Sequence, residues 1–199
     1  ILGNLKHKNI INIIGYGINF IKIERAICDL HNFIIDNKIY KTDIDTIITQ
    51  IVTGIKYLHN NNIIHCDLKP ANILIFTNML VKICDFGNSH PLNFVPNIKL
   101  CTEAYESIES ILTTTYNKAS DMWALGCIVY FVNNKIELFG RGTEYNKIKR
   151  ILRYVGFSEK YSKKFYKKRY NIINIQKISR PNYLKYYICY EHDRNTINE

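Results

Sequence analysis

The sequence predicts an α+β fold, with short strands near its start and long helices further along. Residues 10–17 and 20–25 are rich in β-branched side chains and are punctuated by Gly15 and Gly17, so we expect two strands of a small sheet. Two later stretches have the apolar spacing or the apolar content of helices. Strands followed by helices are typical of an α+β domain.

The first long helix is expected at residues 42–58. Thr42 offers an N-cap, and Asp45 is the acidic residue three positions on. Apolar side chains then recur at helical spacing and give one apolar face; they are Ile44, Ile47, Ile48, Ile51, Ile55 and Leu58. A second helix, at 119–132, is almost wholly apolar, as expected for a helix buried on all sides. Further helices are expected within residues 143–199.

A two-stranded ribbon is expected between two polar motifs. Its strands are the hydrophobic runs Ile73–Ile75 and Leu80–Cys84. The run His65–Asn72 precedes the ribbon, and Asp85-Phe86-Gly87 follows it. The ribbon should therefore hold the two motifs in register.

Together the two motifs supply the groups that move a phosphoryl group. Asp67 can orient a substrate hydroxyl and take its proton, and Lys69 is a positive charge for the transferring phosphate. Asn72 and Asp85 offer hard oxygen ligands of the kind that Mg²⁺ prefers.

These residues resemble the motifs of the eukaryotic protein kinases. Residues 65–72 are similar to the catalytic loop H-R-D-x-K-x-x-N, and residues 85–87 to the metal loop D-F-G. Asp121–Ile128 resembles the motif D-x-W-x-x-G-C, and Arg194–Glu199 resembles R-x-T-x-x-E, whose Arg pairs with the Glu that here would be Glu109. The resemblance implies a protein-kinase-like fold, mainly the helical large lobe with remnant strands of the small lobe.

The resemblance also sets the expected domain organisation. Leu5–Ile10 is similar to the family's L-x-H-x-N-I, so residues 1–26 would be a remnant of the small lobe and residues 27–199 a large lobe truncated near its end. The family's Gly-rich loop, strand lysine and helix glutamate would lie before Ile1. We therefore expect a fragment of a longer protein that has negligible kinase activity by itself.

A nucleotide site follows from the same resemblance, with ATP and Mg²⁺ as the implied cofactors. Ile23 occupies the gatekeeper position, and Glu24-Arg25-Ala26 occupies the hinge, whose backbone would hydrogen-bond adenine. An apolar strand that runs into a helix needs no ligand, which is the alternative interpretation of this segment.

Three further residues are implied around the nucleotide. Asp29 lies where the family often has a ribose contact, although an aspartate here would cap a helix equally well. Leu74 would form the floor of the adenine pocket or belong to the ordinary core. Cys84 would line the inner wall of the pocket, and the alternative is a buried inert thiol.

The resemblance also indicates the substrate. Thr102 would bridge Asp67 and Lys69, and serine/threonine kinases carry lysine at the position of Lys69. The expected partner is a protein with a serine or threonine acceptor, and a regulatory protein is a candidate second partner. Glu137–Glu144 resembles a segment of the cyclin-dependent and mitogen-activated kinase group, but Glu106 replaces that group's Arg, so proline-directed specificity stays open.

Cys66 departs from the family pattern. Kinases with Arg at this position use it to gather a phosphorylated activation loop, because a guanidinium binds phosphate bidentately and a thiol cannot. We therefore expect no control through phosphates on Ser89 or Thr102.

Scaffold roles are implied for other motif residues. His65 and Phe86 resemble members of the hydrophobic spine. Asp121 would orient the catalytic loop through backbone hydrogen bonds, and the alternative is a simple helix N-cap.

Composition limits the compartments, membrane partners and source genomes that are expected for this protein. The six cysteines show no C-x-x-C spacing and are expected to be reduced thiols, which favours an intracellular protein of the cytoplasm or nucleus. No apolar run reaches the roughly 18 residues of a membrane span, so no membrane partner is expected. The excess of Ile, Asn, Lys and Tyr is typical of an A/T-rich genome, such as that of a large DNA virus or a protist.

Two alternatives to a kinase stay open. A pseudokinase would bind partners or nucleotide without catalysis, and the intact set Asp67, Lys69, Asn72 and Asp85 argues against it. A nucleic-acid-binding module would use the net charge of +10 and the basic tract 160–169. A charge run is more often a solvated face, so nucleic acid is not an expected partner.

Overall fold

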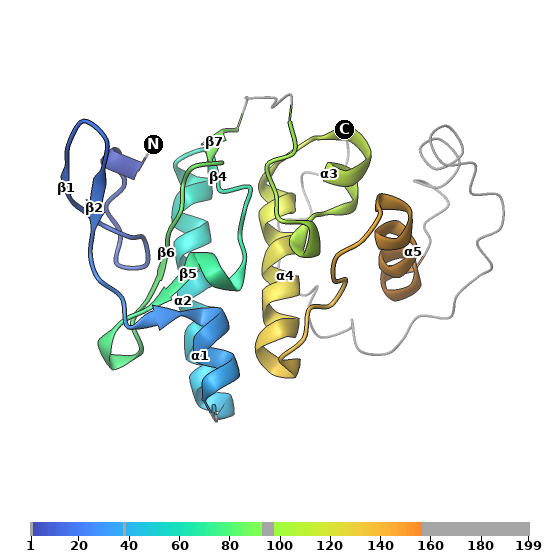
Figure 1. Ribbon diagram of the computed structural model, residues 1–199, viewed down its shortest axis with the longest axis horizontal. Coiled ribbons are helices and arrows are strands. Elements are labelled where there is room, and N and C mark those ends of the chain that lie inside the picture. Colours follow the sequence, from blue (N-terminus) through green and yellow to red (C-terminus); the bar gives the residue numbers. More distant parts are fainter. Residues whose placement is uncertain (1, 38, 93–97, 157–199) are drawn as a thin grey trace. The chain divides into compact units, whose positions relative to one another are not determined.

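The computed structural model describes most of the first 156 residues (Figure 1). The described ranges are 2–37, 39–92 and 98–156. The expected helices beyond residue 156, the basic tract 160–169 and the motif at 194–199 therefore lie outside the described residues.

The chain divides into two compact units, residues 1–141 and residues 142–199. In the first unit the elements are β1 (Ile13–Tyr16), β2 (Ile21–Ile23), β3 (Cys28–Asp29), α1 (Leu30–Asp36), α2 (Lys41–Asn60), β4 (Ile63–Ile64), β5 (Ile73–Ile75), β6 (Val81–Ile83), β7 (His90–Pro91), α3 (Ile108–Thr113) and α4 (Lys118–Asn134). The second unit contributes α5 (Glu144–Val155) to the described residues. The predicted boundary between residues 26 and 27 stays a prediction.

The expected strands form two separate antiparallel assemblies. β1 and β2 make a hairpin that pairs Ile13 with Ile23, and both strands are shorter than the sequence pattern indicated. β3, β5 and β6 form a three-stranded sheet with β5 in the centre. In this sheet Ile73 pairs with Ile83, so the predicted ribbon between the two polar motifs is confirmed.

Helix α2 carries the predicted apolar face. Ile47, Ile51, Ile55 and Leu58 are each 1% exposed or less, and burying each such side chain contributes about 1.5–3 kcal/mol. The predicted N-cap was wrong, because the helix begins at Lys41 with Tyr40 as its N-cap. The Asp43 side chain accepts a hydrogen bond from the Tyr40 amide at 3.4 Å, so an acidic residue two positions before Asp45 supports the first turn.

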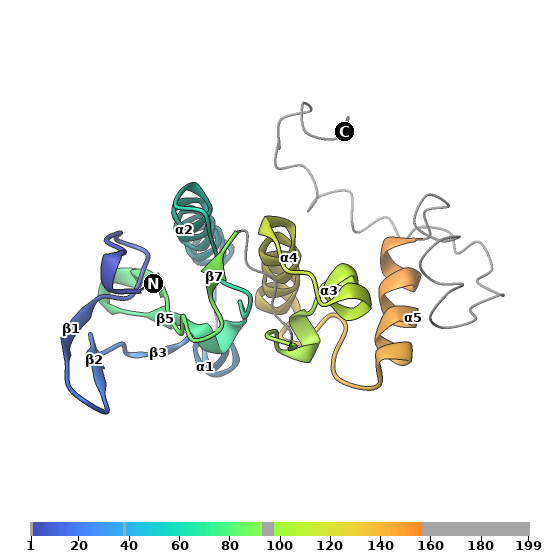
Figure 2. The ribbon, with the colours of Figure 1, turned by 90° about the horizontal axis from the view of Figure 1, so that it is seen from above.

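Helix α4 packs against α2, and the two lie side by side in both views (Figures 1 and 2). The predicted helix at 119–132 is present, but it is not buried on all sides: Ala119 is exposed, and Met122, Gly126, Val129 and Tyr130 on one face are half-buried. Asn117 caps its start by accepting hydrogen bonds from the Ala119 and Ser120 amides. A largely buried helix of this kind can present a side chain to the loop beside it without exposure to water.

The first prediction compares the glycines inside these two helices. A Cβ added at Gly54 of α2 would lie 3.0 Å from the Asn9 carbonyl oxygen and 2.9 Å from the Ile83 Cδ1 atom, whereas a Cβ at Gly126 of α4 would meet nothing within 4 Å. Gly54→Ala should lower the free energy of unfolding by about 1–3 kcal/mol through overpacking. Gly126→Ala should raise it by about 0.5–1 kcal/mol, because alanine favours the helix. Urea unfolding measures both, and changes of the same sign would contradict the packing described.

Candidate active site

The loop that carries Asp67 runs from β4 to β5 and is held by Asp121, a residue of α4 that is 1% exposed. The Asp121 carboxylate accepts hydrogen bonds from the His65 and Cys66 amides, each at 3.0 Å. The His59 Nε2 atom lies 2.8 Å from the same carboxylate. The predicted orienting role of Asp121 is therefore present, and the alternative of an N-cap is wrong because Asn117 caps α4.

The hydrogen bonds that Asp121 accepts hold the backbone of Cys66 in an unfavourable conformation. Cys66 has a φ of 70°, in the left-handed region that costs a non-glycine residue about 1–2 kcal/mol. Fixed hydrogen bonds to two successive amides offset this cost and keep the following residue, Asp67, pointing toward the segment that follows β7.

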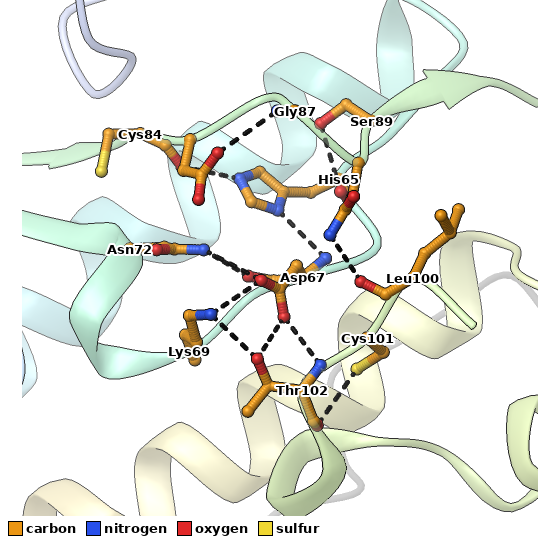
Figure 3. Close-up of polar contacts among 12 residues, drawn as sticks. His65, Asp67, Lys69, Asn72, Cys84, Gly87, Ser89, Leu100, Cys101 and Thr102 are labelled. Carbon is orange, nitrogen blue, oxygen red and sulfur yellow. Dashed lines mark hydrogen bonds and ion pairs between the residues drawn. The ribbon is translucent and has the colours of Figure 1, made fainter. Parts of the chain in front are cut away.

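Asp67, Lys69 and Thr102 form one hydrogen-bonded cluster (Figure 3). The Lys69 Nζ atom donates to Asp67 Oδ2 at 2.8 Å and to Thr102 Oγ1 at 2.9 Å. Thr102 donates to Asp67 Oδ1 through both its hydroxyl, at 2.7 Å, and its amide, at 2.8 Å. The structure thus brings together the three side chains for which the sequence predicted a catalytic role, with Thr102 between the other two.

These contacts decide the ionisation of Asp67. Burial alone would raise the pKa of this carboxyl, but the hydrogen bonds from Lys69 and Thr102 and the charge of Lys69 outweigh burial, so the pKa lies below its ordinary value. Asp67 is therefore an anion at neutral pH, and it can accept a hydrogen bond from an incoming hydroxyl.

The two polar motifs are joined by backbone contacts. The Cys84 amide donates to the Asn72 carbonyl at 2.9 Å, which places the residue before Asp85 against Asn72. The His65 Nε2 atom lies 2.9 Å from the Cys84 carbonyl, and a carbonyl only accepts, so this nitrogen donates. The His65 ring also contacts the Phe86 ring, with 5.1 Å between the ring centroids.

The donor atoms of Asn72 and Asp85 fit a magnesium ion. The Asn72 side-chain nitrogen donates to the Asp67 carbonyl at 2.8 Å, which leaves the amide oxygen as the group available to a cation. The Asp85 side chain is exposed and accepts from the Gly87 amide at 3.3 Å. Among the described residues no group of three or more His, Cys, Asp or Glu side chains could hold a metal by itself. An ion at these two residues would therefore take further oxygens from water or phosphate.

The expected hinge residues connect β2 to β3. Ile23 is partly exposed, at 40%, and the Glu24 amide donates to the Asn12 carbonyl at 3.3 Å. The Glu24 side chain accepts from Lys82 Nζ at 2.5 Å and from the Asn12 amide at 2.7 Å. An adenine contact at this segment would accordingly use backbone groups of Glu24 and Ala26, as the resemblance implies.

The sequence prediction missed Lys82. This lysine is 5% exposed on β6, and its partner Glu24 lies 58 positions earlier in the chain. A buried ammonium requires such a partner, because burial without one carries a large desolvation cost. A lysine inside the otherwise apolar run Leu80–Cys84 was the one signal that could have indicated the ion pair.

The other expected nucleotide contacts lie on neighbouring strands. Asp29 of β3 and Leu74 of β5 are direct partners in the sheet. Both Asp29 carboxylate oxygens accept hydrogen bonds from Asn32, through its amide at 2.9 Å and its side chain at 2.8 Å, so Asp29 caps α1. The ribose contact stays a prediction.

Burial, with the neighbouring negative charges of Asp85 and Asp29, raises the pKa of Cys84 to about 12, so this thiol is inert at neutral pH.

A model of the protein kinase domain matches residues 1–190 of this chain. The chain belongs to the protein kinase family. This finding confirms the resemblance to the protein kinases drawn from the motifs.

Individual kinases are similar over most of this chain. Mitogen-activated protein kinase 5 of Oryza sativa subsp. indica is 33% identical over 169 residues, which cover 78% of this chain and 46% of that protein. A putative serine/threonine-protein kinase of Acanthamoeba polyphaga mimivirus is 34% identical over 202 aligned positions, which cover 87% of this chain and 36% of that kinase. This chain thus spans less than half the length of these two relatives.

A solved kinase structure shows the same fold. A chain of the yeast RNA Pol II CTD kinase CTDK-1 complex superimposes with a TM-score of 0.75 at 29% sequence identity, over 81% of this chain and 56% of that chain. The protein kinase fold and the mixed α+β class are thereby confirmed. No helix in the described part of the kinase chain has the length and apolar content needed to cross a membrane.

The second prediction concerns the Thr102 hydroxyl. Because its hydrogen bond helps to lower the pKa of Asp67, Thr102→Val should raise that pKa, as measured by carbon-13 NMR titration of the Asp67 carboxyl. A carboxyl with a lowered folded-state pKa stabilises the fold above its unfolded pKa of about 3.9, and this stabilisation is lost as the pH falls through the folded value. The stability difference between Thr102→Val and the unmodified chain should therefore be larger at pH 7 than at acid pH.

The matched control for this prediction is Thr102→Ser, which keeps the hydroxyl donor and should keep the low pKa of Asp67. An unchanged Asp67 pKa in Thr102→Val would show that the hydroxyl has no part in setting the charge of this carboxyl.

Proposed function

We propose that the kinase containing this chain transfers the γ-phosphoryl group of Mg-ATP to serine or threonine hydroxyls of a protein substrate. The observation that carries the proposal is the ionised Asp67 carboxylate, buried to 6% exposure and shared by Lys69 and Thr102. Phosphoryl transfer depends on positioning and electrostatic stabilisation more than on covalent chemistry by the protein. A fixed proton acceptor beside a fixed cation therefore supplies most of what the attacking hydroxyl requires.

Each residue of the cluster has a distinct role in this proposal. Asp67 accepts a hydrogen bond from the substrate hydroxyl, orients its oxygen toward the phosphorus and takes its proton as the new bond forms. Lys69 places positive charge beside the transferring phosphoryl group. Thr102 holds these two side chains 2.7–2.9 Å from its own hydroxyl and so fixes their relative positions.

Asn72 and Asp85 are proposed as the protein ligands of Mg²⁺. A magnesium ion would neutralise the charge that develops on the phosphate oxygens. The amide oxygen of Asn72 and the exposed carboxylate of Asp85 are hard ligands, and the hydrogen bond from Cys84 to Asn72 keeps their backbones adjacent. The backbone of Glu24 and Ala26 is proposed to hold adenine, with Ile23, Asp29, Leu74 and Cys84 around it.

The substrate class rests on the resemblance of Lys69 and Thr102 to serine/threonine kinases. Glu106, where the cyclin-dependent and mitogen-activated group has Arg, is 2% exposed and lies 3.7 Å from Lys99. A carboxylate in place of a guanidinium reverses the charge at this position, so proline-directed specificity is not part of the proposal. The small-lobe assignment of residues 1–26 and the large-lobe assignment of residues 27–199 belong to the same proposal.

The third prediction tests the base. In the full kinase that contains this chain, Asp67→Asn should lower kcat for phosphorylation of a serine- or threonine-containing protein by about 100-fold or more, because general base catalysis typically contributes that factor. Binding of Mg-ATP, measured by calorimetry, should stay close to that of the unmodified protein. Asp45→Asn, a change at an exposed position of α2, is the control and should alter neither quantity. A protein that binds Mg-ATP but shows no transfer even with Asp67 intact would instead be the pseudokinase.

The fourth prediction tests the metal ligand. Asp85→Asn removes the charged member of the proposed ligand pair, and loss of even an outer partner of a metal typically costs about 10- to 100-fold in affinity. Binding of ATP should therefore weaken at least tenfold in the presence of Mg²⁺, while the far-UV circular dichroism stays unchanged. Equal Mg-ATP affinity in the variant and the unmodified protein would remove Asp85 from the metal site.

A further inference from the structure

Cys66 and His90 form a buried contact that the proposed reaction does not use. The Cys66 Sγ atom lies 3.2 Å from the His90 Nε2 atom, and the two residues are 4% and 5% exposed. The His90 Nδ1 atom lies 2.9 Å from the Pro91 carbonyl oxygen. A carbonyl can only accept, so the His90 Nδ1 atom carries a proton, and the Cys66 thiol can donate to Nε2 when that nitrogen carries none.

The surroundings keep the thiol in the form that can donate. Burial raises the pKa of Cys66 well above its ordinary value, and the negative charges of Asp121 and Asp67 raise it further. A protonated thiol and a neutral imidazole together carry no charge. With Nε2 unprotonated, the contact is an uncharged hydrogen bond, and this is the arrangement on which the proposal below rests.

The thiol also packs against the far end of the segment that begins at Asp85. Cys66 forms a buried cluster with Ile64 and Tyr116, and Leu100 and Cys101 pack against this cluster. His90 belongs to β7, which pairs with β4. Cys66 thus contacts both the start of this segment, through His90, and its end, beside Thr102.

Cys66 occupies the position at which the resembling kinases use Arg to gather a phosphate. We propose that Cys66 and His90 are a positioning pair for Asp67, whose uncharged hydrogen bond holds residues 88–92 and 98–102 on the catalytic loop without a phosphate. The proposal rests on the proposed function, because it assigns the pair to the placement of Thr102 beside Asp67. The pair acts through Thr102 and touches neither substrate nor nucleotide.

The test is amide hydrogen exchange of the protein, which needs no catalysis. Two amides report on the segment, since Leu92 donates to the Asn62 carbonyl at 2.9 Å and Thr102 donates to Asp67 Oδ1 at 2.8 Å. Cys66→Ala should raise the exchange rate of both about fivefold, the factor that corresponds to one lost hydrogen bond. Cys66→Ser retains a donor and should restore most of the protection.

Controls separate this pair from general loosening of the core. Cys127→Ala removes another buried thiol, 2% exposed on α4, and should leave the Leu92 and Thr102 amides unchanged. His90→Phe should accelerate both amides, and the double variant with Cys66→Ala should add little more, because the two residues act as a unit. For an active protein, Cys66→Ala should lower kcat about fivefold with an unchanged KM for Mg-ATP, and phosphatase treatment should leave activity unaltered.

If a variant fails to fold, the proposal can still be tested by nitrogen-15 NMR of the His90 ring nitrogens in the unmodified protein. His90 should show a protonated Nδ1 and an unprotonated Nε2 at neutral pH. A protonated Nε2, equal exchange in Cys66→Ala and the unmodified chain, or no recovery in Cys66→Ser would each overturn the pair. If the exchange results are as expected but the protein shows no phosphoryl transfer, the Cys66–His90 pair is supported and the proposed function is rejected.

Discussion

The site depends on one buried carboxylate, that of Asp121. It accepts two backbone amides of the catalytic loop and contacts His59 of α2, so a single side chain of α4 connects both long helices to the loop. Each donor left unsatisfied in the interior would cost about 1–3 kcal/mol. The left-handed backbone of Cys66, directly before Asp67, persists because these bonds over-determine it. A largely buried helix supplies this carboxylate from a rigid position.

Short hydrogen bonds then connect Asp67 and its loop to the rest of the site. Its side chain is fixed by Lys69 from its own loop and by Thr102 from a segment 35 positions further along. The hydrogen bond from Cys84 to Asn72 joins the metal motif to the same loop. The catalytic loop, the ribbon of β5 and β6 and the segment that contains Thr102 are therefore connected by hydrogen bonds. The pKa of Asp67 is low because Lys69 and Thr102 both contact its carboxylate.

Local patterns in the sequence were sufficient for the long helices, the ribbon and the motif residues, but not for the short elements β4, β7 and α3. The apolar period of α2 and the ribbon of β5 and β6 are properties of adjacent residues, so they could be predicted. The ion pair of Lys82 with Glu24 and the contact of Cys66 with His90 could not, because each joins segments that meet only in the folded chain. The N-cap of α2 was misplaced by two residues, since Asp43 rather than Asp45 reaches back to its first turn.

The substitution at Cys66 shows how one residue changes the physics of a whole segment. A guanidinium at this position would need to be compensated by the neighbouring carboxylates or by an added anion, because a buried cation without a partner is strongly destabilising. A phosphate would be such an anion, and its removal would then loosen the segment. A thiol that donates to a neutral imidazole needs no added group. In our proposal, the contact that holds Thr102 beside Asp67 is therefore built into the fold and does not depend on modification.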